Sequence, residues 1–239
     1  MAERVVDLQR CGYKLIQDSD SHCFGGDAVL LSSFAKVKKN ESALDLGCGT
    51  GVIPILLCAK TEGKSFTGLE IQEKLAETAR RNVELNGLTG RVNIITGDIK
   101  DINNIFGAGS FDVVTANPPY IRVNDGPAGV SDMRSVATRE ILIDLRGVIS
   151  GAARVLKNGG RFYLVHRPER LVEIVNLLTE FKLEMKTLRF VQAAADKKPS
   201  AALIAATHRG KARLNVMPPL VICAGPGVYT REAEDIYNG

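Results

Sequence analysis

The sequence predicts an α/β fold in which helices cover both faces of an open, mostly parallel sheet of seven strands, with one reversed strand at its edge. Short apolar runs bounded by Gly, Asn and Asp alternate with amphipathic stretches, as expected when parallel strands are joined by crossover helices. The chain has 239 residues, 45% of them hydrophobic, which suits one core and not two large ones. We expect one domain over residues 1–239, with a core at 41–207, an N-terminal segment at 1–40 and a tail at 208–239.

Seven runs have the character of strands. They are expected at residues 42–46, 66–70, 92–96, 111–116, 161–165, 183–191 and 201–207. Helices are expected at residues 28–36, 52–60, 72–86, 140–156 and 168–179. Asn86-Gly87 and Asn158-Gly159-Gly160 are good helix C-terminal signals, because these residues readily take the left-handed conformation. The last two strands are expected to pair across the loop 192–200 at the sheet edge, one of them reversed.

The composition excludes several classes of protein. The first residues lack the apolar stretch of a secretory signal, and the apolar run at 52–59 is too short to cross a bilayer. The five cysteines have no C-x-x-C spacing, and His22, His166 and His208 are scattered along the chain, so neither set indicates a metal site. We expect a cytoplasmic protein with no membrane partner and no metal.

The basic residues are unevenly distributed. Residues 151–215 contain 13 Lys and Arg against 5 Asp and Glu, whereas the whole chain has a net charge of +4. Clustered cations favour a polyanion such as nucleic acid. Solvated basic residues on helix and strand faces explain the same count, so both interpretations stay open.

A glycine-rich turn follows the first predicted strand and reads Asp45-Leu46-Gly47-Cys48-Gly49-Thr50-Gly51. Glycines suit such a turn because it uses positive φ and leaves bare amides to face a ligand. The spacing differs from the G-x-G-x-x-G of dinucleotide-binding proteins. It resembles the first motif of class I methyltransferases that use S-adenosylmethionine (SAM), and this likeness implies their Rossmann-like fold. Asp45 is then expected to hold the SAM ammonium group, directly or through water.

Two further acids follow the next two predicted strands. Glu70 ends the second strand, where a carboxylate can accept both hydroxyls of a ribose. Asp98 follows the third strand, where the same family holds the adenine amine. Either acid alone is equally compatible with a helix N-cap or a loop position. With Asp45, they predict one crevice along three successive strand ends.

The fourth predicted strand ends in Asn117-Pro118-Pro119-Tyr120, which we predict to be the catalytic group. Two prolines fix φ and restrict the residue before them, so a stiff, extended turn is expected. An exocyclic amine on an aromatic ring is a poor nucleophile, because its lone pair is delocalised. The Asn117 side-chain oxygen and the Pro118 carbonyl can orient that lone pair, while Tyr120 stacks on the base. Such alignment is worth about 7–11 kcal/mol of barrier, and no general base is required.

The Asn-Pro-Pro-Tyr string does not name its substrate. It resembles the fourth motif of enzymes that methylate adenine N6, cytosine N4, guanine N2 or the amide of glutamine. Release-factor glutamine methyltransferases typically carry a helical domain before the first motif, but only 44 residues precede Asp45. DNA adenine methyltransferases usually add a target-recognition domain, and no such block is visible. Adenine in RNA is the leading acceptor; guanine N2 in ribosomal RNA, a protein glutamine and a binding protein without turnover remain alternatives.

Four segments together resemble the bacterial tRNA1(Val) (adenine-37-N6)-methyltransferase family. They are Phe-Gly-Gly-Asp-Ala-Val-Leu-Leu at 24–31, the catalytic string at 117–120, residues 160–171, and Met-Pro-Pro-Leu at 217–220. The resemblance covers nearly the whole chain and implies SAM-dependent methylation of an anticodon-loop adenine in tRNA. The chain departs from the family at residues 137–140, Ala-Thr-Arg-Glu in place of Ala-Arg-His-Glu, and in the loop 121–136. These departures bear on substrate identity, because that loop should border the base pocket.

The resemblance also implies that the segment from Phe24 to Asp27 closes over the cofactor. From the residues alone, Asp27 is expected as the N-cap of the helix at 28–36, and it can serve both roles. The full set of expected cofactor contacts is Phe24, Asp27, Asp45, Gly47, Cys48, Gly49, Gly51, Glu70, Ile71, Asp98, Ile99 and Asn117.

Four basic residues are candidate RNA contacts. Arg167 and Arg170 follow the fifth strand and can offer fork-shaped donors to phosphates, and Lys197 and Lys198 lie in the loop 192–200. In the competing interpretation, one of the arginines pairs with Glu169 or another nearby carboxylate to hold its loop, and the lysines are only solvated.

Overall fold

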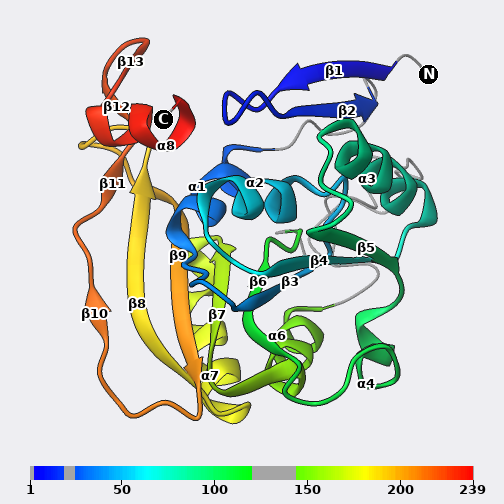
Figure 1. Cartoon of the computed structure of the whole chain (residues 1–239). Coiled ribbons are helices and arrows are strands. Elements are labelled where there is room, and N and C mark those ends of the chain that lie inside the picture. The colour runs from blue at the N-terminus through cyan, green and yellow to red at the C-terminus, as the bar shows by residue number, and fades with distance from the viewer. Residues whose placement is uncertain (1–2, 19–24, 120–143, 239) are drawn as a thin grey trace, which may run out of the picture.

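The structure is a computed structural model that describes residues 3–18, 25–119 and 144–238 (Figure 1). Its strands are β1 (Glu3–Asp7), β2 (Lys14–Asp18), β3 (Ser42–Leu46), β4 (Ser65–Glu70), β5 (Val92–Thr96), β6 (Phe111–Ala116), β7 (Leu156–His166), β8 (Leu183–Gln192), β9 (Pro199–His208), β10 (Asn215–Val216), β11 (Leu220–Val221), β12 (Cys223–Gly225) and β13 (Val228–Tyr229). Its helices are α1 (Gly26–Phe34), α2 (Val52–Lys60), α3 (Glu73–Leu85), η1 (Ile99–Asp101), α4 (Ile102–Ile105), α6 (Leu145–Val155), η2 (Pro168–Arg170), α7 (Leu171–Glu180) and α8 (Arg231–Asn238).

All seven predicted strands are present and form one continuous sheet in the order β5-β4-β3-β6-β7-β9-β8. The pairs from β5 to β7 are parallel, whereas β9 is antiparallel to both of its neighbours. Two short strands from the predicted tail, β10 and β11, pair with the outer side of β8 and bring the sheet to nine strands. The predicted open, mostly parallel sheet is therefore confirmed.

The reversed strand is not at the edge, and that part of the prediction is wrong. β9 lies between β7 and β8, so β8 is the outer member of the pair. The crossover through α7 brings the chain back parallel to β7 but leaves a gap one strand wide. β9 turns back into this gap and completes the hydrogen bonding of both neighbours, which an antiparallel hairpin strand can do with a short loop.

Two apolar clusters place the helices on opposite faces of the sheet (Figure 1). One cluster joins the buried sides of α1, α2 and α3 to the sheet, and the other joins α4, α6 and α7 to the other face. Both faces of the central strands are thus covered, and β3 contributes Leu44 and Leu46 to one cluster and Ala43 to the other. Such two-sided burial explains why these strands have continuous apolar runs.

Helix boundaries follow the predictions closely in the core. α2 covers the predicted 52–60, and α3 lies one residue inside the predicted limits at each end. Gly87 follows α3 with φ +66°, as its role as a C-terminal signal requires. The predicted start of α6 at residue 140 lies outside the described residues, and its described part begins with the side-chain cap of Asp144 on the Gly147 amide.

The first helix begins earlier than predicted, which corrects the role given to Asp27. Gly25 is the N-cap, with extended φ and ψ, and Asp27 lies inside the first turn of α1. Its negative charge there favours the helix N-terminus. A Cβ at Gly26 would lie only 2.9 Å from the Tyr237 hydroxyl, so the glycine allows α8 to pack closely against α1.

A hairpin of β1 and β2, which was not predicted, lies over α3 (Figure 1). The Asn86 side chain accepts from the Lys14 amide at 2.8 Å, and Asn82 accepts from the Ile16 amide at 2.6 Å. The Asn82 side-chain amide also donates to Thr50 O in the glycine-rich turn at 3.0 Å. The hairpin is thus tied through α3 to the turn. Among the described helices, none has the length and apolar character needed to span a membrane.

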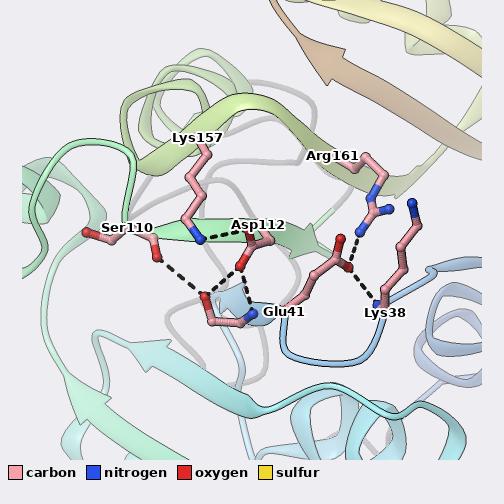
Figure 2. A network of polar contacts seen from close by, with 7 residues as sticks. Lys38, Glu41, Ser110, Asp112, Lys157 and Arg161 are labelled. Carbon is pink, nitrogen blue, oxygen red and sulfur yellow. Dashed lines mark hydrogen bonds and ion pairs between the residues drawn. The ribbon is translucent and has the colours of Figure 1, made fainter.

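A polar network joins the amino-terminal ends of β3, β6 and β7 (Figure 2). Asp112 accepts from the Ser42 amide at 2.9 Å and forms an ion pair with Lys157 at 2.7 Å. Glu41 pairs with Arg161 and accepts from the Lys38 amide at 2.6 Å. These bonds connect the amino-terminal ends of the strands, whereas the predicted site follows their carboxyl ends.

Candidate active site

The glycine-rich turn and the Asn117 turn leave the sheet from two adjacent parallel strands. Leu46 and Ala116 are register partners at the ends of β3 and β6. The chain runs from β3 outward to β4 and β5 and then crosses to β6 on the other side of β3, so this is the point where the strand order reverses. Ligands of open α/β sheets bind in the crevice at such a switch point.

The turn after β3 has the left-handed backbone conformation that its glycines allow. Gly47, Gly49 and Gly51 have φ of +72°, +55° and +84°. A Cβ on Gly47 or Gly49 would meet nothing within 4 Å, so these two positions border open space. A Cβ on Gly51 would lie 3.2 Å from Ala79 Cβ, so this glycine lets α2 approach α3.

The amides of this turn bond within the protein, contrary to the expectation that they face the cofactor. The Gly47 and Cys48 amides donate to Leu69 O at 2.8 and 3.0 Å, and the Gly49 amide donates to the Glu70 carboxylate at 2.9 Å. A buried backbone donor must find a partner, and the end of β4 supplies it. The Cys48 side chain packs in the core, where burial raises its pKa well above the usual range.

Glu70 is a buried acid that links the glycine-rich turn to the helix that follows β4. Its other oxygen accepts from the Gln72 amide at 2.9 Å, so the carboxylate connects the glycine turn to the start of α3. Burial raises the pKa of Glu70, while the amide hydrogen bonds from Gln72 and Gly49 act in the opposite direction. Glu70 therefore has the structural role that was the alternative interpretation, because it accepts hydrogen bonds from two backbone amides. This role does not exclude a contact with a ribose.

Asp45 has an incomplete set of partners. Its side chain is 2% exposed, and Oδ1 accepts from the Thr115 hydroxyl at 2.6 Å. Oδ2 is buried and has no hydrogen-bond partner among the described residues. Burial raises the pKa of Asp45 to about 8, against the lowering effect of the Thr115 hydrogen bond. A buried, unpartnered carboxylate oxygen is costly, and its presence indicates a place for a ligand donor.

Three further candidate contacts, Asp98, Ile71 and Ile99, lie after the carboxyl ends of β4 and β5 and differ in exposure and bonding. Asp98 caps η1 by accepting from the Lys100 amide at 2.9 Å, which is the alternative structural role. Ile71, after β4, is 37% exposed. Ile99 packs in the core and is 8% exposed.

The Asn117 turn is described as far as Pro119. Pro118 is buried, and Asn117 and Pro119 are half-buried at the end of β6. Phe24 and Tyr120, which were predicted to cover the cofactor and to stack on the base, lie outside the described residues, as do 121–140. Asn117 therefore lies beside Gly47, because the residues before them are register partners. The predicted base-stacking residue and the loop after it are outside the described residues.

Sequence analysis missed two residues of this site. Thr115 is fully buried in β6 and bonds to Asp45 across the strand pair. Gly68 in β4 has no room for a side chain, because a Cβ would lie 2.6 Å from Cys48 Sγ and 2.9 Å from Ile94 Cδ1. The sequence signals for these residues were a hydroxyl inside the apolar strand β6 and a glycine inside the apolar strand β4. Their partners could not be predicted, because they depend on which strands are neighbours in the sheet.

The candidate RNA contacts differ in availability. Arg170 forms an ion pair with Glu173 at 2.7 Å with its side chain only 11% exposed, as the loop-holding interpretation expects. Arg167 donates to Ser200 O at 2.9 Å, which connects η2 to the start of β9. The Lys197 side chain is 65% exposed, and its Nζ lies 3.3 Å from Asp196 Oδ2. Within the described ranges, no group of three or more His, Cys, Asp or Glu side chains is arranged to hold a metal ion.

Comparison with known proteins agrees with this geometry. Residues 37–206 match the family model described as a methyltransferase domain. The chain is 29% identical over 185 residues to a tRNA1(Val) (adenine(37)-N6)-methyltransferase of Porphyromonas gingivalis, covering 75% of this chain and 72% of that protein. A Shewanella halifaxensis protein of the same name is 23% identical over 231 residues, 95% of this chain and 93% of the relative.

Among solved structures, a predicted O-methyltransferase from Agrobacterium tumefaciens has the same fold. It superposes with a TM-score of 0.72 at 21% identity, over 89% of this chain and 95% of that one. Sheet order, site position and family match agree, and the chain belongs to the methyltransferase domain family.

Proposed function

We propose that this protein transfers a methyl group from SAM to N6 of an adenine in tRNA, in the anticodon loop. The observation that carries the proposal is the adjacency of two turns at the switch point. One turn follows the end of β3, where Asp45 Oδ2 has no hydrogen-bond partner among the described residues, and the other begins at Asn117. The named activity of the relatives, tRNA1(Val) adenine-37 N6-methylation, supports the same acceptor.

The described residues fit SAM as the cofactor. Asp45 Oδ2 is a buried carboxyl oxygen with no hydrogen-bond donor among the described residues, which suits the ammonium group of SAM. Glu70 and Asp98 stand at the ends of the two next strands, where their carboxylates suit the ribose hydroxyls and the adenine amine. Exposed Ile71 offers an apolar surface beside them. When bound, SAM supplies an electrophilic methyl group on a sulfonium.

Asn117 and Pro118 act by positioning the acceptor. The Asn117 side-chain oxygen and the Pro118 carbonyl accept the two hydrogens of the amine and turn its lone pair out of conjugation with the ring. The amine nitrogen forms the new bond to the methyl carbon as the bond from carbon to sulfur breaks, and the surplus proton leaves to water. Two consecutive prolines keep these acceptors fixed, so little orientation entropy is lost during the reaction.

The RNA is proposed to lie along the same edge of the sheet. The loop between β8 and β9 carries Lys197 and Lys198, and Arg167, directly after β7, bonds to Ser200 at the start of β9. All three basic residues therefore lie at the end of the sheet where β6 leads into Asn117. An anticodon-loop base is already unpaired, which lowers the cost of presenting it. We place the reaction in the cytoplasm and treat residues 1–239 as one catalytic domain, with 1–40 covering the cofactor.

The decisive experiment is nucleoside analysis of tRNA from cells with and without this gene product. N6-methyladenosine should be missing without it and return after treatment with the purified protein and SAM. Methyl incorporation only into protein or DNA would contradict the proposal. An increase in N2-methylguanosine without methyladenosine would favour a guanine acceptor, and label on a glutamine would favour a protein substrate.

RNA binding is tested separately through salt. Phosphate contacts release counterions, so log Kd for tRNA should rise with log salt concentration, and the slope should become shallower when Lys197 and Lys198 are both replaced by Gln. The same slope in the variant would remove these two lysines from the interface.

A further inference from the structure

Thr115 and Asp45 are joined across two strands that are far apart in the chain. They are register partners in the parallel pair β3–β6 and are 70 residues apart in sequence. Thr115 is fully buried, and its hydroxyl donates to Asp45 Oδ1 at 2.6 Å. A buried hydroxyl is unfavourable unless it is hydrogen-bonded, so this contact satisfies Thr115 and a carboxylate oxygen together.

The contact divides the two oxygens of Asp45 between two tasks. Oδ1 is held by the protein, and Oδ2 has no donor among the described residues. Among the described residues, Thr115 makes the only hydrogen bond to the Asp45 side chain, and rotation of the carboxyl group would break it. Thr115 therefore sets the direction in which the unpartnered oxygen is presented, two residues before Asn117 begins the acceptor turn.

We propose that Thr115 is a positioning residue that holds the Asp45 carboxyl group in the orientation in which its unpartnered oxygen receives the ammonium group of the cofactor. This inference rests on the proposed use of SAM. Thr115 lies near the end of β6, and Asn117 follows this strand directly. The end of β6 therefore supports both Asp45 and the acceptor turn.

The electrostatic surroundings support this role. Asp45 is buried, and Glu70 from β4 adds a like charge, so both effects raise the pKa of Asp45, to about 8. Cys48 in the turn is a further titratable group nearby: burial and the charge of Asp45 raise the pKa of its thiol, and the charge of Arg80 on α3 lowers it. The Thr115 hydrogen bond acts against these effects and favours the charged form. Removal of the hydroxyl should therefore move the ionisation of Asp45 to higher pH.

The test is the binding of SAM by isothermal titration calorimetry between pH 6 and 8.5, with Thr115→Val, Thr115→Ser and a control. Val has the shape of Thr without the donor, and Ser keeps the donor without the methyl group. Thr67→Val on the adjacent strand β4 makes the same chemical change away from Asp45. Hydrogen bonds to charged groups are strong, so Thr115→Val should weaken SAM binding at neutral pH by about 10- to 100-fold.

Two further results are specific to positioning through Asp45. The pH at which SAM affinity is half-maximal should rise in Thr115→Val and return towards the wild-type value in Thr115→Ser. The titration of SAM itself is common to all variants, so differences between the profiles report on the protein. With saturating SAM, kcat for tRNA methylation should stay within about threefold of wild type while KM for SAM rises, because the acceptor turn is intact.

The outcomes separate this inference from the function on which it rests. If the wild-type protein does not bind SAM, the proposed function fails. If wild type binds SAM and Thr115→Val binds it equally with an unchanged pH profile, only the role of Thr115 fails. Thr115→Ala provides the same comparison if Thr115→Val does not fold, and thermal melting without ligand checks that each variant is folded. Equal weakening in Thr67→Val would also overturn the inference.

Discussion

Leu46 and Ala116 lie opposite each other at the ends of β3 and β6, so Gly47 and Asn117 begin their turns side by side. Two strings separated by 65 residues of chain thereby form one site. In the proposed function, the first turn and Asp45 bind the cofactor, and the second turn supplies two acceptors for the amine. Their adjacency makes the following predictions testable one residue at a time.

Asn117→Ala should abolish most of the transfer and leave SAM binding intact. Removal of one oriented polar group from an active site typically lowers kcat by about 100- to 1,000-fold. Single-turnover methylation of tRNA and calorimetric SAM binding measure the two effects separately. Asn93→Ala, at an exposed position on β5, is the matched control and should behave as wild type. A variant with full cellular function but no transfer would indicate a binding role.

Glu70→Gln should weaken SAM binding by about tenfold, because the neutral amide is a poorer acceptor for the Gly49 amide and for a ribose. The same change at Glu84, an exposed residue of α3, should have no effect. Calorimetry at pH 7.5 gives the affinities, and thermal melting detects any loosening of the turn. Unchanged affinity in Glu70→Gln would exclude a ligand role for this carboxylate.

Gly68→Ala should destabilise the protein by about 1–3 kcal/mol, because its Cβ would overlap Cys48 and Ile94. Cys48 belongs to the glycine turn, so SAM affinity should fall as well. Urea unfolding and SAM binding measure these effects. Gly90→Ala, where a Cβ meets nothing within 4 Å, is the control. If both variants were equally stable, the packing of Cys48 against β4 would be wrong.

Glu41→Ala should lower the free energy of unfolding by about 1–3 kcal/mol without changing SAM affinity. Glu41 and Arg161 are each about one-fifth exposed, so removal of the acid leaves a largely buried guanidinium without its ion-pair partner. Because this pair lies towards the amino-terminal ends of the parallel strands, whereas the glycine turn follows their carboxyl ends, the cofactor site should be unaffected. Glu62→Ala, at an exposed position, serves as the control in urea unfolding. A loss of SAM binding in Glu41→Ala would show that the two edges are coupled.

His166 should make the protein sensitive to acid. Burial, assisted by the charge of Arg170, lowers its pKa from 6.5 to about 4. Between these values the unfolded chain binds more protons, so the contribution of His166 to stability is complete above pH 6.5 and is lost as pH falls towards 4. Urea unfolding at pH 7, 5.5 and 4.5 should show a steeper loss in wild type than in His166→Asn. Asp45 and Glu70 contribute slopes of the opposite sign, but equally in both proteins, so parallel curves would contradict the assignment.

The site could be predicted in part because its motifs are local. The glycine turn follows a strand and precedes α2 within a few residues, and the prolines after Asn117 restrict their own backbone. Periodicity predicted β5, β6 and α2 with their observed limits. Local chemistry also led to a wrong detail at Asp27: it was expected as the N-cap, but it lies in the first turn of α1, and Gly25 is the N-cap.

The sequence by itself determined the alternation of strands and helices, the glycine turn and the stiff turn after β6, because each depends on residues that are close along the chain. Only the tertiary structure decided that β9 enters between β7 and β8, that Thr115 bonds to Asp45, and that the turn amides bond to the end of β4. These contacts join residues from different strands. They depend on which strands become neighbours, and that order follows from the burial of both sheet faces as a whole and from no single segment.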